Sequence, residues 1–178
     1  MGRPHHKFVR LLVGGGIVAA VLLAAMVWLD RPLRTAAAPR GIVSFELAGS
    51  CAAARNIIES WKPAGRRNAA LSLWLDYGFL IAYALVLALL CGYVAASWPD
   101  RYRGIRRTGR LLARSQWVAA LLDAFENVIL QQILAGATAA ILPQMARWAA
   151  LAKFTLIACG GVYIVLAGGY RFLRRCER

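Results

Sequence analysis

Two carboxylates and an amide stand close together in a strongly apolar part of the sequence. They are Asp123, Glu126 and Asn127, and they lie within the apolar run from Ser115 to Ala140. Residues three and four positions apart share one face of a helix, so a helix would point all three side chains the same way. Charged groups at membrane depth are costly and survive mostly where they face a bundle interior or a wet cavity. This stretch is therefore the first candidate for chemistry.

Polar residues elsewhere in the apolar runs can join this group. They are Asp76, Tyr83, Gln131 and Lys153. If neighbouring helices are antiparallel and rise 1.5 Å per residue, Asp76 and Lys153 lie roughly level with Glu126, and Tyr83 lies level with Asp123. We therefore expect the polar groups of three helices to converge in one half of a bundle.

Such a cluster is suited to binding a proton, a cation or a small polar substrate. Burial disfavours the ionised form of a carboxylate, so grouped acids can take up and release protons, as a proton-coupled carrier requires. The sequence supports a second chemistry, because Asp123, Glu126 and Asp76 offer oxygen ligands suited to Mg²⁺ or another hard divalent cation. A metal there would serve an embedded enzyme acting on lipid-linked substrates. The apolar runs contain no histidine, which argues against zinc.

The same residues also have a purely structural interpretation. Asp76 would pair with Lys153, while Asn127 and Gln131 would make interhelical hydrogen bonds worth about 0.6–2 kcal/mol each. Lys153 alone would extend its ammonium to the membrane surface. Glu46, in the segment between the first two apolar runs, joins the cluster only if that segment folds inward.

Composition places the chain among polytopic membrane proteins. Of its 178 residues, 60% are hydrophobic and 17% charged, and its mean hydropathy is +0.55. Soluble domains are about 45–50% apolar and about a quarter charged. The apolar excess falls in four long blocks, so we expect an all-α integral membrane protein folded as one domain, a four-helix transmembrane bundle.

The expected elements follow in chain order. Transmembrane helices are predicted at about 8–29, 70–98, 115–140 and 148–172, with a turn at Pro143. The segment 30–69 is extracytoplasmic and contains an amphipathic interfacial helix at about 44–61. A basic loop, 99–114, connects the second and third crossings on the cytoplasmic side. In the first crossing Gly16, Ala20 and Ala24 form a small-residue face for helix packing.

Basic residues predict the orientation and the partners. The net charge is +14, with 13 Lys and Arg on the N-terminal side of the bundle and nine on the other. The dense cluster in the short second loop favours a cytoplasmic location for both termini, in the inner (cell) membrane. The basic residues sit at helix ends, where they meet the bilayer and its anionic headgroups. No nucleic-acid motif accompanies them, so nucleic acid is not expected as a partner.

No soluble type of catalytic motif is present, and the four cysteines form no C-x-x-C pair. The sequence therefore favours a function other than catalysis. It predicts a small membrane protein whose carboxylate and amide cluster binds a proton, cation or polar substrate, in connection with transport. A metal-dependent membrane enzyme and an accessory subunit, acting through a homo-oligomer or a partner subunit, are the alternatives.

Overall fold

The computed structural model describes residues 3–176, and the side chains of residues 6–173. The protein is all-helical: 86% of it is helix, and the described residues contain no strand. Its long helices are α1 (Arg3–Asp30), α4 (Pro63–Ser97), α5 (Arg103–Leu134) and α6 (Leu142–Tyr163). A π-helical turn, Ile164–Gly168, continues α6 into α7 (Gly169–Cys176). The ends of the chain, residues 1–2 and 177–178, lie outside the described residues.

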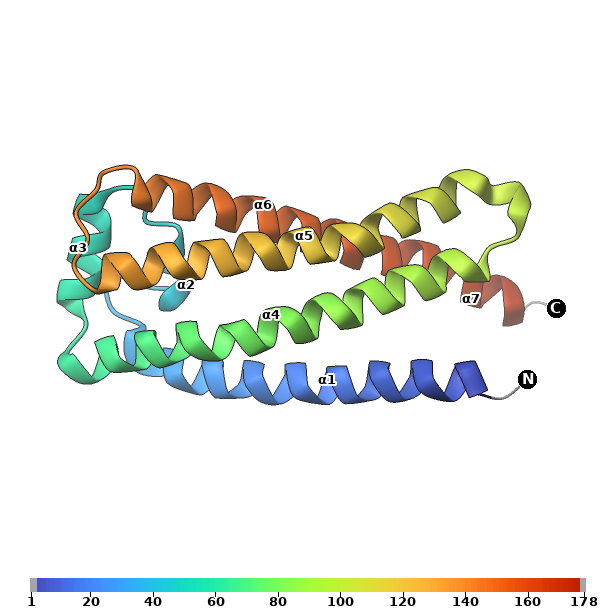
Figure 1. The fold of residues 1–178 in the computed structure, drawn as a ribbon, viewed down its shortest axis with the longest axis horizontal. Coiled ribbons are helices and arrows are strands. Elements are labelled where there is room, and N and C mark those ends of the chain that lie inside the picture. The colour runs from blue at the N-terminus through green and yellow to red at the C-terminus, as the bar shows by residue number, and fades with distance from the viewer. Residues whose placement is uncertain (1–2, 177–178) are drawn as a thin grey trace.

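The long helices lie side by side in chain order (Figure 1). The main contacts join α1 to α4, α4 to α5, and α5 to α6. The described ends of the chain lie at one end of the bundle, and two short helices, α2 (Ile42–Glu46) and α3 (Cys51–Ser60), cover the other end. Four helices are long and apolar enough to cross a membrane, as the sequence predicts.

The prediction of a basic loop at 99–114 is wrong, because most of this segment is helix. A 3₁₀ turn at Asp100–Tyr102 leads directly into α5, which begins at Arg103. Arginine is a good helix former, and the guanidinium groups here lie on the outside of the helix, so nothing in the segment breaks it. Arg106 also forms an ion pair with Asp100 near the start of the helix.

The third and fourth helices also differ from the expected bounds at the turn between them. Helix α5 ends at Leu134 rather than near 140, because Gly136 adopts a left-handed conformation with φ +102° and closes a Schellman motif. Helix α6 begins at Leu142 rather than 148. Pro143 lies in its first turn, where the missing N–H costs nothing, and does not form the predicted turn.

The predicted single helix 44–61 is two helices separated by residues 47–50. The first helix, α2, ends at Glu46, and Gly49, with a left-handed φ of +69°, turns the chain before the second helix begins. Ser50 then caps α3, because its side chain accepts a hydrogen bond from the Ala53 N–H at 3.2 Å. The glycine and the capping serine that follows it therefore separate two helices within one amphipathic pattern.

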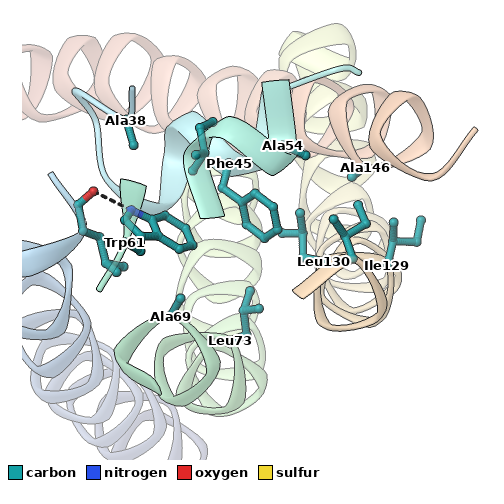
Figure 2. Packing of buried hydrophobic residues seen from close by; sticks show 12 residues of the cluster. Ala38, Phe45, Ala54, Trp61, Ala69, Leu73, Ile129, Leu130 and Ala146 are labelled. Atoms are coloured by element: carbon teal, nitrogen blue, oxygen red, sulfur yellow. Dashed lines mark hydrogen bonds between the residues drawn. The ribbon is translucent and has the colours of Figure 1, made fainter. Parts of the chain in front are cut away.

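The segment 31–62, here called the cap, packs its aromatic side chains onto the ends of the long helices. Trp61 and Phe45 are each 1% exposed and meet edge to face at 5.5 Å between ring centroids. Around them lie Leu73 of α4 and Leu130 of α5 (Figure 2). The Trp61 indole N–H donates to the Leu33 carbonyl at 2.8 Å. The cap is therefore part of the hydrophobic core.

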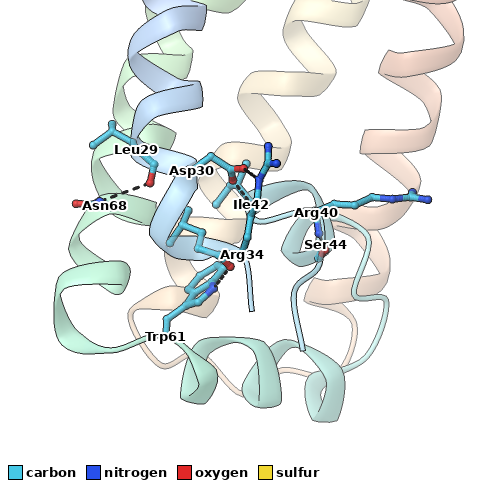
Figure 3. A network of polar contacts seen from close by, with 9 residues as sticks. Leu29, Asp30, Arg34, Arg40, Ile42, Ser44, Trp61 and Asn68 are labelled. Atoms are coloured by element: carbon cyan, nitrogen blue, oxygen red, sulfur yellow. Dashed lines mark hydrogen bonds and ion pairs between the residues drawn. The ribbon is translucent and has the colours of Figure 1, made fainter. Parts of the chain in front are cut away.

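A carboxylate at the end of α1 fixes the start of α2. Asp30 accepts hydrogen bonds from Arg34 Nε at 3.0 Å and from the Ile42 N–H at 2.8 Å (Figure 3). Gly41, with φ +58°, places its backbone directly against that carboxylate, and a side chain at this position would collide with it. Asp30 therefore joins the first long helix to the cap.

The predicted small-residue face of the first helix is not the face that meets α4. Ala20 and Ala24 are exposed, and no atom lies within 4 Å of a Cβ placed on Gly16. Gly15 approaches Val86 of α4 instead. The prediction of this packing face is therefore wrong, and the close approach to α4 occurs at Gly15, one residue before Gly16.

Candidate functional site

Lys153 of α6 lies at the centre of a buried charged cluster. It is 4% exposed, and its ammonium nitrogen lies 2.5 Å from Asp123 Oδ1, 2.9 Å from Glu126 Oε2 and 3.8 Å from Glu46 Oε2. Asp123 and Glu126 share one face of α5 and are 3% and 0% exposed. The alternative in which Lys153 extends to a surface is wrong, because the carboxylates hold its ammonium inside the bundle.

The remaining polar groups extend the cluster along α4. Tyr83 donates its hydroxyl proton to Asp123 Oδ2 at 3.0 Å. Asn127 donates to Asp76 Oδ2 at 2.6 Å, so Asp76 is bound by the amide and not by Lys153 as the structural interpretation supposed. All of these side chains are less than 10% exposed. Three long helices thus contribute to one polar site, at the levels that helical rise predicts.

Gln131 stands apart from this group. Its amide nitrogen is buried without a hydrogen-bond partner among the described residues, and no hydrogen bond or ion pair connects it to the cluster. The expectation that Gln131 belongs to the site is therefore not supported by contacts. It lies one further turn along α5, beyond the reach of Lys153.

Glu46 is the member that the sequence interpretation did not assign to the site. It lies at the end of α2, and the cap places its carboxylate within 3.8 Å of Lys153. The available signal is an acid next to Phe45 within the otherwise uncharged stretch 41–49 of the cap. Finding it required knowing that the cap folds inward, which depends on the distant Trp61 contact.

Some carboxylate oxygens in the cluster have no directed hydrogen bond. Glu46 Oε2 and both Glu126 oxygens are buried without a donor among the described residues. The 2.9 Å approach of Lys153 to Glu126 is an ion pair whose direction falls outside hydrogen-bond geometry. Buried acceptors without a donor are rare, and a proton on one of the two glutamates would supply the missing donor.

Burial raises the pKa of Glu46 above the ordinary glutamate value of 4.5. Asp123 of α5 and Asp30 of α1 raise the pKa further, while Lys153 of α6 and the neighbouring carboxyl group of Glu126 lower it. Desolvation is the largest of these causes, so the neutral form of Glu46 is the one that the docked cap favours.

The charges in the cluster do not balance when every group is ionised. Four acids, Glu46, Asp76, Asp123 and Glu126, face the single base Lys153. In a low-dielectric interior an excess of three negative charges is costly, so protons or a bound cation must compensate it. The ammonium occupies the centre of the acids, and no group of three or more metal-ligating side chains is arranged for a metal among the described residues. The Mg²⁺ alternative stays a prediction.

A cavity of about 500 Å³ adjoins the cluster. Asp76, Asp123 and Lys153 reach it from the long helices, and Glu46 reaches it from the cap. Its size lies within the range of small-molecule sites in proteins, about 300–1,000 Å³. The cluster therefore faces a space that a ligand can enter.

Replacing Lys153 with Met should destabilise the protein strongly. The carboxylates would then lie together without their cation, and losing one partner of a buried ion pair typically costs about 3–5 kcal/mol. The double variant Lys153→Met with Asp123→Asn should cost less than the sum of the single variants, by about 0.5–3 kcal/mol. Equilibrium unfolding in mixed micelles measures all three. Lys62→Met, at an exposed lysine, is the control, and an equal effect of both lysine changes would contradict the assignment.

Replacing Glu46 with Gln should change how stability depends on pH. Because the docked cap raises the pKa of Glu46, the wild type has its full stability from this group below about pH 4.5 and loses it as pH rises through the raised value. Glutamine does not ionise, so the stability of Glu46→Gln relative to wild type should increase with pH, by at most about 1.4 kcal/mol per pH unit.

Thermal unfolding of both proteins between pH 5 and 8 measures this difference. Glu59→Gln, at an exposed glutamate of α3, is the matched control and should show a constant difference from wild type. A constant difference for Glu46→Gln as well would show that docking of the cap is not linked to protonation of Glu46.

Comparisons with known proteins identify no relative of this chain. No protein-family model, no curated protein and no solved structure matches the chain significantly. The interpretation of the site therefore depends on its own geometry and charge.

Proposed function

We propose that this chain is a small integral membrane protein whose buried carboxylate and amide cluster binds and releases protons, coupled to a cation or a small polar substrate during transport. Its four apolar helices cross the bilayer, and the charged cluster lies in the half of the bundle that carries the cap. The cap folds over the bundle mouth at that interface instead of lying flat on it.

One observation carries this proposal. Three acids surround one ammonium and a fourth, Asp76, lies beside them, and three glutamate oxygens lack a hydrogen-bond donor among the described residues. An interhelical connection serving only stability would need one acid for Lys153, as a balanced pair. The additional acids leave negative charge that Lys153 does not compensate, and protons or a cationic ligand can compensate it reversibly.

The distribution of basic residues supports the orientation. The end of the bundle opposite the cap carries the arginines of the start of α5, including the Arg106 and Arg110 side chains. We therefore place that end, and with it both termini, in the cytoplasm of a cell with an inner membrane. A fluorescent protein that matures only in the cytoplasm, fused to the C-terminus, should fluoresce. A fusion within the cap loop at Ala36 should remain dark, and the reverse pattern would invert the orientation.

Asp123→Asn and Glu126→Gln should reduce proton movement through the protein. Proteoliposomes containing a pH-sensitive dye and driven by a potassium diffusion potential should acidify faster than empty liposomes. Each variant removes one exchangeable charge beside Lys153, so the rate should fall about tenfold or more. Asp100→Asn, at an exposed acid at the other end of the bundle, is the control and should leave the rate unchanged.

Other results would redirect the assignment. Equal rates for wild-type and empty liposomes would contradict transport of protons. Stoichiometric divalent metal in the purified protein, lost in Asp123→Asn, would favour the metal-dependent enzyme. A partner that copurifies with both folded variants would favour an accessory role.

A further inference from the structure

The cavity beside the cluster has two apolar walls that the charged residues do not occupy. Leu23 and Val27 of α1 line one side, and Phe154 and Ile157 of α6 line the other. Three of these side chains are also partly exposed on the outside of the bundle, at 48%, 49% and 40% for Leu23, Val27 and Phe154. The cavity therefore extends from the polar cluster to the apolar outer surface between α1 and α6.

Asp76 provides a carboxylate oxygen that remains available within this cavity. The residue is 8% exposed and lines the cavity, and its Oδ2 accepts the hydrogen bond from Asn127. Its Oδ1 has no hydrogen-bond partner among the described residues. Both oxygens of Asp123, by contrast, are engaged, one by Tyr83 and the other by Lys153. Asp76 is thus the acid best placed to receive a donor from a ligand.

The charges around the cavity favour a cationic ligand. Glu46 also lines it and carries an oxygen without a donor, while the ammonium of Lys153 is already shared among carboxylates. Arg34 and Arg40 also line the cavity, at its cap side. Arg34 is paired with Asp30, and the Arg40 side chain extends away from that pair (Figure 3). An anionic group placed at the inner end would lie against the carboxylate of Asp76, whereas a cationic group would find an acceptor there.

We propose that the cavity binds an organic ammonium with an apolar body. The ammonium donates to Asp76 Oδ1 and lies near Glu46, and the hydrocarbon part lies between Val27 of α1 and Phe154 of α6. An amphipathic amine combines both requirements, since its charged end matches the acids and its apolar end matches the walls. This inference rests on the proposed function, because it names the ligand class of the same cluster.

Binding of n-octylamine to the full-length protein in phosphatidylcholine nanodiscs tests the proposal. Isothermal titration, with empty nanodiscs as the blank for partitioning, should give an affinity about tenfold or more above that of 1-octanol and of octanoate. The alcohol keeps the apolar body without the charge, and the carboxylate reverses the charge. Equal affinities for the three compounds would overturn the proposal.

Two variants locate the binding site. Asp76→Asn removes the carboxylate and should weaken octylamine binding about tenfold, while Asp100→Asn should not. Val27→Phe narrows the cavity from the exposed side of α1 without touching the charges, and it should weaken octylamine and octanol alike. Val21→Phe, at another exposed valine of α1 that lies outside the cavity lining, is its control. Full octylamine affinity in both Asp76→Asn and Val27→Phe would place binding elsewhere.

The two proposals can fail independently. Proton movement that depends on Asp123 and Glu126, with no preference for octylamine, would retain the proposed function and reject this ligand class. Selective octylamine binding lost in Asp76→Asn, without proton movement, would retain the ligand site and reject transport of protons.

Discussion

The position of Lys153 is the constraint on which the structure depends. An ammonium in an apolar bundle is tolerable only where acids surround it, and those acids must come from several elements. Asp123 and Glu126 come from α5, and Glu46 comes from the cap. The charged contact therefore fixes α5, α6 and the cap in one register. The alanine-rich and leucine-rich surfaces around the contact would permit several registers. Dispersion and burial supply most of the packing energy, and the ion cluster selects one arrangement.

The cap completes the site by apolar means. Trp61 and Phe45 anchor it among Leu73 and Leu130, and that anchoring brings Glu46 over Lys153. Burying an aromatic side chain of this size contributes about 3–5 kcal/mol, judged by the cost of truncating such residues. That amount can offset the desolvation of one carboxylate. The polar and apolar parts of the cap are thus energetically linked.

Much of this arrangement could be predicted from the sequence, because it follows from periodicity and helical rise. The four apolar helices are of this kind, and so are the shared levels of Tyr83 with Asp123 and of Lys153 with Glu126. The partner choice of Asp76 was not predictable, since Asn127 and Lys153 lie at similar depth and only the rotation of α5 and α6 about their axes decides between them. The helical start of α5 was missed because arginine clusters occur in loops and helices alike.

The order of synthesis gives the Glu46–Lys153 contact a further consequence. The ribosome produces the cap before α4, α5 and α6, so Glu46 exists long before its cation does. Until α6 joins the bundle, Glu46 of the cap and the acids of α5 have no positive partner in the apolar interior, and only the apolar contacts of Trp61 and Phe45 favour docking of the cap. The Glu46–Lys153 contact is therefore completed only after α6 has been made. A chain that stops before Lys153 would carry Glu46, Asp123 and Glu126 without the cation that compensates them.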